Sequence, residues 1–450
     1  MVVAAYVGAT WYVGGKVQEQ VEKQVAVAQG FLDTHSSVAL FDQSRSFSIS
    51  QYERGLFSSK VQYELQLKNE DTDVGLLFED TIYHGPWPIA AGYFTPALAV
   101  AKGELLPTEQ IQEWFEATGG HAPYQGETVF GFGGHITGQG HFAATQFQDP
   151  ETGAQLATDV TTLQYESKNN QTEFSLAMHL PKMNFQEPDQ VQIELTQLNL
   201  AASLNSKETE TYHSTLGLDS LNINSATIGS VELQGFQVAL DSRQHEALID
   251  AKVHYDIEQI WAEGINWGHL DLLIDLKNIH QGLLNEIGVL ADSDDAEDEL
   301  KLQRLLGEFL SYKPELKQAK LTWANEKGES FAETRMSAAP ALVEYFQQGT
   351  ELRDELGQVY NQLYLDISLS RPMLQQLFGE DSLMAAMFDM MFDSAVQMGT
   401  ELGLVTYDNT QVRLQFEFDS ERNVLLLNQQ PITEEELVQL FLALQMGGLL

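Results

Sequence analysis

The chain has 450 residues, of which 65 are Asp or Glu and only 24 are Lys or Arg, so its formal net charge is −41. A surface this negative repels polyanions, which excludes nucleic acid as a partner and disfavours anionic lipid headgroups. The hydrophobic content of 43% and aromatic content of 10% are enough for a substantial core. The absence of cysteine excludes disulfides, thiolate metal ligands and cysteine nucleophiles.

The N-terminal segment is apolar, and its first charged side chain is Lys16. As a helix, residues 1–15 span about 22 Å, which is short of the roughly 30 Å hydrocarbon core of a bilayer. Three interpretations are open: an uncleaved membrane anchor, the core of a signal peptide, or a buried N-terminal helix of a soluble protein. We favour the anchor, in which Trp11 and Tyr12 lie at the headgroup interface. The scarcity of Lys and Arg then places the rest of the chain away from the cytoplasm.

Helical spacing continues over residues 17–31, after which strand patterns take over. Between Lys60 and Leu67, apolar and polar residues alternate, which predicts a sheet with one dry and one wet face. The alternation recurs along the chain and is nearly continuous from Leu218 to Ile279. The first two-thirds of the chain are therefore predicted to be rich in antiparallel strands.

Helical patterns return after Ile279. Helices are predicted at residues 294–314, 340–346, 371–378, 382–402 and 433–444, with strands at 319–323, 360–369, 411–418 and 423–427. Thr433 and Glu436 have the spacing of a capping box. The predicted fold class is α+β: a long twisted antiparallel β-sheet of many short strands, with helices mainly in the C-terminal half and an N-terminal membrane-anchor helix. The predicted parts are an anchor (1–15), a helical stalk (16–35), a β-rich domain (36–280) and an α+β domain that packs on the sheet (281–450).

A stretch rich in glycine and histidine is the most catalytic-looking part of the sequence. His121, His135 and His141 offer imidazoles to a metal, and the neighbouring glycines offer backbone amides to a phosphate. However, the glycines match neither a dinucleotide-binding nor a P-loop fingerprint, and the histidines lack metalloprotease spacing. We expect a glycine-rich strand with a tight turn, and we predict no catalytic residue, no metal and no cofactor.

Methionines recur on the predicted helix at 382–402, where Met384, Met387 and Met391 share one face. Core packing is the ordinary explanation for such residues. The alternative is a helix that faces lipid or a protein partner, because methionine adapts to varied apolar surfaces. The two interpretations predict opposite exposure.

Two short motifs, YERGLFSS at residues 52–59 and HGPWP at 84–88, resemble signature stretches of the YdgA family of Gram-negative envelope proteins, a family of unknown function. The signature residues are Arg54, Gly55, Phe57, Ser58, Ser59, His84, Gly85, Pro86 and Pro88. LTWANEKGES at 321–330 and the C-terminal hairpin and helix extend the resemblance over nearly the whole chain. It implies a periplasmic body tethered to the inner membrane, distantly similar to AsmA-like proteins, whose curved sheets present an apolar trough to lipid.

Two functions are compatible with these observations. The favoured one is a non-enzymatic envelope protein that binds lipid or another hydrophobic ligand on an apolar sheet face. The alternative is a structural protein that self-associates through the sheet or the methionine-rich helix; an enzyme is less favoured, because no nucleophile, metal or acid–base set stands out. The candidate trough is lined by Phe174, Leu176, Leu233, Val238, Leu272 and Ile274.

Overall fold

The computed structural model describes residues 2–34, 44–68, 73–168, 172–207, 209–227, 229–291, 296–351, 355–377, 383–422 and 424–439. The chain divides into two compact units. The first comprises Met1–Lys207 with Ile223–Thr227, and the second comprises Glu208–Asn222 with Ile228–Leu450. The boundary expected between residues 280 and 281 coincides with the change from strands to helices, whereas the compact units divide earlier in the chain.

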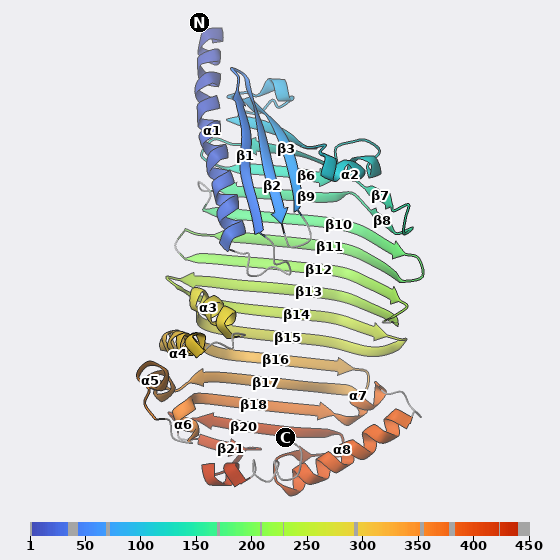
Figure 1. Cartoon of the computed structure of the whole chain (residues 1–450), viewed down its shortest axis with the longest axis vertical. Helices are drawn as coiled ribbons and strands as arrows, with labels where there is room; N and C mark the ends of the chain where they lie inside the picture. The colour runs from blue at the N-terminus through green and yellow to red at the C-terminus, as the bar shows by residue number, and fades with distance from the viewer. Residues whose placement is uncertain are drawn as a thin grey trace. The chain divides into compact units, whose positions relative to one another are not determined.

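Antiparallel strands form most of both units, and most helices lie in the second (Figure 1). This confirms the predicted fold class in its main features, a large antiparallel β-sheet of many strands with helices mostly towards the C-terminus. These features of the fold do not by themselves assign a membrane-anchoring role to the N-terminal helix. Within the described ranges, no helix is both long enough and apolar enough to cross a bilayer.

The first unit begins with one continuous helix, α1 (Val2–Thr34), which covers both the predicted anchor and the predicted stalk. Its strands are β1 (Ser44–Arg54), β2 (Ser58–Lys68), β3 (Asp73–His84), β4 (Ala99–Leu106), β5 (Tyr124–Phe130), β6 (Ile136–Phe142), β7 (Thr145–Gln148), β8 (Gln155–Thr158), β9 (Thr161–Lys168), β10 (Glu173–Glu187) and β11 (Val191–Asn205). A short helix, α2 (Gln112–Ala117), precedes β5. Neighbours pair antiparallel in the order β1-β2-β3-β4-β5-β6-β9-β10-β11, and β8 pairs with both β7 and β10.

The core of the first unit lies between α1 and the sheet. Val61 of β2 and Ile82 of β3 are fully buried, and Val13, Val17 and Val21 of α1 pack in the same cluster. The four-residue spacing of these valines places them on one face of the helix, as an amphipathic helix on a sheet requires. The alternation predicted for residues 60–67 is confirmed, because β2 turns its odd-numbered apolar residues towards this side.

The second unit alternates strands with helices. Its strands are β12 (Glu210–Ser225), β13 (Gly229–His245), β14 (Leu248–Ala262), β15 (Ile265–His280), β16 (Glu315–Asn325), β17 (Gly328–Ala338), β18 (Tyr360–Ser370), β19 (Thr406–Tyr407), β20 (Gln411–Asp419), β21 (Val424–Leu427) and β22 (Gln430–Pro431). Its helices are α3 (Gln281–Ala291), α4 (Ala296–Ser311), α5 (Pro340–Gln348), α6 (Leu356–Val359), α7 (Arg371–Gln376) and α8 (Leu383–Glu401). From β13 to β18 each strand pairs antiparallel with the next, and β18 pairs with β20.

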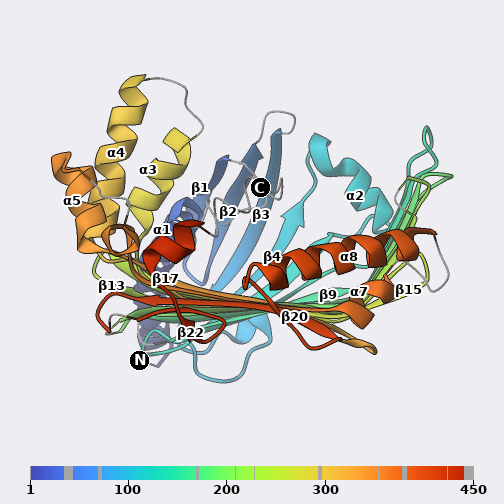
Figure 2. The ribbon, with the colours of Figure 1, turned by 90° about the horizontal axis from the view of Figure 1, so that it is seen from below.

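The helices of the second unit gather at the ends of its strands. Figure 2 shows α3, α4 and α5 near one end and α8 near the other, on the same side of the sheet. Phe416 and Phe418 of β20 are buried and pack against Leu437 at the last edge of the unit. The predicted capping box before Leu437 is confirmed: Glu436 N donates to Thr433 Oγ1 (3.2 Å), and Thr433 N donates to the Glu436 carboxylate (2.8 Å). The rest of that predicted helix, residues 440–444, lies outside the described residues.

Candidate functional site

The two signature motifs meet in space, because the antiparallel pairing of β2 and β3 brings the start of one strand to the end of the other. Ser59 Oγ lies 2.9 Å from His84 Nε2, and both residues are buried, with exposed fractions of 1% and 2%. His84 Nδ1 lies 3.3 Å from the Leu56 carbonyl oxygen. A carbonyl can only accept, so Nδ1 carries the proton and Nε2 accepts from the serine hydroxyl. Burial lowers the pKa of His84 below its usual value.

Arg54 and two glycines of α1 complete this cluster. Arg54 Nη2 donates to the Trp11 carbonyl oxygen (2.5 Å), and the guanidinium lies 5.2 Å from the centre of the Trp11 ring. A Cβ atom on Gly14 would lie only 2.7 Å from His84 Cε1, and one on Gly15 would lie 3.4 Å from the Arg54 guanidinium. Glycine at these positions therefore allows α1 to approach the signature residues closely. We call Arg54, Ser59, His84, Trp11 and Gly14 the signature cluster.

The remaining signature residues shape the adjoining turns. Gly55 N donates to the Ser58 carbonyl (2.8 Å), and His84 N donates to the Phe57 carbonyl (2.9 Å). Gly85 N donates to the Leu98 carbonyl (2.6 Å), and a Cβ atom on Gly85 would overlap the Ala97 carbonyl oxygen. Pro88 is fully buried, and Pro86 O accepts from Ala97 N (3.1 Å). Backbone hydrogen bonds thus hold both turns, and the space beside Gly85 is too small for a side chain.

A buried serine and histidine at hydrogen-bond distance have the arrangement of a nucleophile and its base. In this conformation, however, Val13 and Val17 of α1 pack on the same core, and the exposed fractions of Ser59 and His84 leave no access for a substrate. What the signature cluster does in the structure is fix α1 on β1–β3. The family resemblance indicates Arg54, Ser59 and His84 from the sequence. Their contacts with Trp11 and Gly14 have no local signal, because these residues lie more than 40 positions away from Arg54 or His84.

The glycine-rich stretch forms the expected tight turn, between β5 and β6. Gly131 N donates to the His135 carbonyl (2.7 Å), and Gly133 and Gly134 have φ values of 86° and 80°. His135 pairs with Glu166 (2.8 Å). Among the described residues, His121, His135 and His141 do not come together as a group able to hold a metal.

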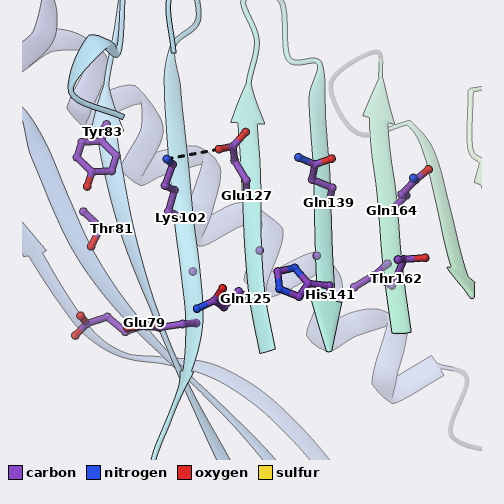
Figure 3. A pocket seen from close by; sticks show the side chains of 15 residues that line it. Glu79, Thr81, Tyr83, Lys102, Gln125, Glu127, Gln139, His141, Thr162 and Gln164 are labelled. Carbon is purple, nitrogen blue, oxygen red and sulfur yellow. Dashed lines mark ion pairs between the residues drawn. The ribbon is translucent and has the colours of Figure 1, made fainter. Parts of the chain in front are cut away.

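A polar hollow of about 720 Å³ lies on the face of β3–β6 and β9 that points away from the buried valines. Figure 3 shows its side chains rising from neighbouring strands, with an ion pair between Lys102 Nζ and Glu127 Oε2 (3.9 Å). Successive cross-strand partners form a row across it: Glu79, Glu104, Gln125, His141 and Thr162. These groups can donate and accept hydrogen bonds in a flat array. In the sequence, the polar positions of the alternating strands are the signal of this hollow, which was not among the predicted sites.

The candidate trough residues are divided between the two units. Phe174 and Leu176 lie on β10 of the first unit, and Phe174 is 40% exposed. In the second unit, Leu233 and Val238 lie on β13, while Leu272 and Ile274 lie on β15. Apart from Phe174, all of these side chains are half-buried. The structure therefore places them in partly covered positions on strands of two separate units.

In the second unit the trough residues belong to a larger apolar surface. Cross-strand partners form a continuous line, which we call the apolar row: Val238, Tyr255, Leu272, Leu321, Ala332, Ile367 and Leu414. A parallel line contains Leu240, Val253, Ile274 and Ala319. Tyr255 and Leu321 are each 40% exposed, and no apolar side chain of β13–β16 is fully buried in the described structure. An extended apolar face thus remains accessible to solvent.

In the described structure, ion pairs and a buried valine attach one face of the methionine-rich helix α8 to the unit. Arg371 pairs with Asp389 (2.9 Å) and Asp393 (2.7 Å), and Val396 is buried on the same side. The other face carries exposed methionines: Met384 (62%), Met387 (51%) and Met391 (66%). Core packing is therefore the wrong interpretation for these three residues. At the other end of the chain, Trp11 and Tyr12 are also exposed, at 60% and 62%.

Comparison with known proteins gives relatives without an assigned activity. The chain is 23% identical to "Uncharacterized protein YihF" of Escherichia coli strain K12 over 95% of its own length and 94% of the relative. It is 25% identical to "Protein YdgA" of the same strain over 29% of this chain and 27% of the relative. An "Uncharacterized protein" of Haemophilus influenzae is 27% identical over 27% of this chain and 34% of the relative. No solved structure matches the chain at a significant level.

The family described as "Bacterial protein of unknown function (DUF945)" matches residues 1–435. That match covers nearly the whole chain, including the signature cluster and the apolar row, and the match to YdgA agrees with the resemblance noted in the sequence. The chain therefore belongs to this family of bacterial proteins of unknown function.

Proposed function

We propose that this protein is a non-enzymatic envelope protein that binds lipid or another hydrophobic molecule along its apolar row. The observation that carries the proposal is the solvent-accessible apolar face of β13–β16, on which Tyr255 and Leu321 keep 40% of their surface exposed. Side chains along this row offer almost no hydrogen-bonding groups, so an acyl chain suits it better than a polar ligand. Complete burial of a leucine side chain contributes about 1.5–3 kcal/mol, so covering the exposed part of each half-buried side chain contributes a fraction of that, and several along the row add up to useful affinity.

The location follows from the same proposal. We place the body in the periplasm, tethered to the inner membrane by the N-terminal segment, with Trp11 and Tyr12 at the headgroup level. The exposure of both rings supports this placement. The net charge of −41 gives the body no attraction to anionic lipid, so any membrane contact has to use apolar surfaces.

The test is native mass spectrometry and lipid extraction on the full chain purified in mild detergent. We expect bound lipid with the wild type. Replacing Leu272 and Leu321 by Gln should lower the bound fraction roughly tenfold, because two apolar contacts are lost. Thr322→Gln is the matched control, since Thr322 follows Leu321 on β16 but points to the opposite face. Absence of lipid from the wild type, or equal loss in the control, would remove the proposal.

A second candidate function is self-association through α8, which its exposed methionine face favours. Sedimentation velocity on the wild type should then reveal a defined oligomer. Replacing Met384, Met387 and Met391 by Gln should dissociate it, whereas Ala386→Gln, at an exposed position on another face of the same helix, should not. A monomeric wild type, or an oligomer that persists in the triple variant, contradicts this role.

A further inference from the structure

Two short motifs with the same His-x-Asp pattern lie side by side on the polar face of the second unit. His254-Tyr-Asp256 on β14 and His269-Leu-Asp271 on β15 each place a histidine and an aspartate two positions apart, on one side of a strand. The antiparallel register pairs Asp256 directly with Asp271. Each histidine then reaches the aspartate of the other strand: His254 Nε2 lies 2.5 Å from Asp271 Oδ2, and His269 Nε2 lies 2.6 Å from Asp256 Oδ2.

The facing carboxylates of Asp256 and Asp271 favour a cation between them. Two carboxylates directly opposite each other on paired strands repel. A neutral imidazole reduces the repulsion between the carboxylates only by hydrogen bonding. The lysines on the same face of the sheet have other neighbours. Lys252 is in register with both Asp241 and Asp275, and the Lys320 ammonium lies over the Phe331 ring at 5.5 Å. Among the described residues, no lysine or arginine forms an ion pair with these four side chains, which carry two carboxylates.

We propose that His254, Asp256, His269 and Asp271 bind a divalent transition-metal ion, with zinc as the fitting example. Two imidazole nitrogens and two carboxylate oxygens are a donor set that zinc accepts in tetrahedral sites. The donor atoms of His254, Asp256 and Asp271 already lie within 4.8 Å of one another, and His269 contacts Asp256. In a tetrahedral zinc site neighbouring donors lie roughly 3.3 Å apart, from zinc–ligand distances of about 2.0–2.2 Å.

Both access and charge agree with this site. The histidine side chains are 45% and 42% exposed and the aspartates 28% and 25%, so the ion reaches them from solvent and the side chains can rotate to close on it. Neutral imidazoles and ionised carboxylates sum to −2, which a divalent ion neutralises. When the ion binds through Nε2, each neutral imidazole keeps its proton on Nδ1, and the ion replaces the hydrogen bond between that histidine and its aspartate.

Metal binding at this site joins β14 to β15. Asp271 alternates along β15 with Leu270 and Leu272, so the site lies directly behind the apolar row, on the opposite face of the same strands. Loading is expected to stiffen the strands that carry Tyr255 and Leu272. The site itself does not depend on lipid binding, and its test is separate.

The experiment is calorimetric titration of the full, chelator-treated chain with Zn²⁺ at pH 7.5. We expect one ion per chain, with affinity lowered at least about tenfold by His254→Ala or His269→Ala. His213→Ala is the matched control, because His213 Nδ1 lies 2.7 Å from Asp241 Oδ1 in a comparable exposed pair with no second histidine or facing carboxylate in its contact. This control should bind zinc as the wild type does.

Two further measurements guard against misfolded variants. Asp256→Asn and Asp271→Asn keep the side-chain shape and should also weaken zinc binding, while the far-UV circular dichroism stays that of the wild type. Cobalt bound to the wild type should show the intense visible absorption of a tetrahedral site, and His254→Ala should lose it. Absence of zinc binding, or affinities equal in the wild type and the folded site variants, overturns the proposal.

Discussion

The α1-covered sheet of the first unit and the apolar row of the second differ in coverage, although their strands show the same alternation. Val61 and Ile82 in the first are fully buried, whereas Tyr255 and Leu321 in the second are each 40% exposed. Both surfaces are apolar faces of antiparallel strands. The difference shows that alternation identifies the apolar face of a sheet, while a separate element decides whether that face becomes core or remains a surface.

The covering element of the first unit is specified by small residues as much as by apolar ones. Val13, Val17 and Val21 supply the contact, and Gly14 lets the helix approach His84. In the second unit the buried cluster around Phe416 lies on the last strands. Tyr255 and Leu321 of the apolar row remain 40% exposed, so no helix in the described part of the unit buries them as α1 buries Val61.

The largest contrast is expected from placing a charge in each region. Val61→Asp buries an unpaired carboxylate beneath α1 and should cost more than about 4 kcal/mol of unfolding free energy. Leu321→Asp puts the same charge on a surface that water already reaches and should cost less than about 1 kcal/mol. Urea unfolding followed by circular dichroism, with hydrogen exchange to assign the region that opens, measures both.

Equal costs for these two substitutions would contradict the contrast in coverage. A large cost at Leu321 would mean that the apolar row is covered in solution. Leu321→Asn serves as the control for shape, because it removes the leucine contacts without adding a charge.

Some features of the fold could be predicted from residues that are near neighbours in the sequence. Others depend on which elements come together in space. The alternation of residues 60–67 and the capping box at Thr433 depend on near neighbours and were confirmed. The contact of Arg54 with Trp11 depends on how α1 lies against β1, and the facing positions of the two His-x-Asp motifs depend on the pairing of β14 with β15. The sequence contains both His-x-Asp motifs, but only the register of β14 and β15 shows that they face each other.

A gain in stability is expected from Asp80→Asn in the covered region. Burial raises the pKa of Asp80 on β3 to about 6, above the usual 3.8. The native state therefore holds the proton more tightly than the unfolded state, and stability is lost as the pH rises from about 4 to 6. The substitution should add between about 1 and 3 kcal/mol at pH 7.5, at about 1.4 kcal/mol per pKa unit with allowance for partial solvent access.

Chemical unfolding of the Asp80→Asn variant at several pH values provides the check. Its advantage over the wild type should shrink towards zero near pH 4, where the native and unfolded aspartates are both largely protonated. An advantage that does not change with pH would assign the effect to the local contacts of the Asp80 side chain, which are the packing over Gly103 and the hydrogen bond with Tyr63.

In the signature cluster, we expect a loss of unfolding free energy that is similar in size or smaller. Ser59→Ala leaves His84 Nε2 without its donor and should cost about 1–3 kcal/mol at pH 7.5. The pKa of His84 is lowered by burial, so the unfolded state takes up the proton first, and stability should fall as the pH drops below about 6.5. Hydrogen exchange over residues 9–21 of α1 at pH 7.5 and 5.5 follows both effects.

Two variants separate these effects from general acid sensitivity. His84→Gln should reduce the acid-induced opening of α1, because the titrating group is gone. Ser48→Ala, at an exposed position on β1, should leave exchange in α1 unchanged. If His84→Gln retains the full acid response of the wild type, another group is responsible.

The smallest expected effect concerns the exposed edge of the same cluster, where Arg54 meets Trp11. Arg54→Lys keeps the charge but loses the planar contact with the indole and the donor to the Trp11 carbonyl, and it should cost about 0.5–1 kcal/mol. A double-mutant cycle with Trp11→Ala isolates the ring contact, because the backbone carbonyl remains in that variant. A coupling free energy near zero, with exchange of residues 9–15 unchanged, would show that the glycines and valines of α1 hold the helix without this contact. A measurable coupling would instead assign Arg54 a direct part in keeping α1 on the sheet, which is the coverage that the apolar row lacks.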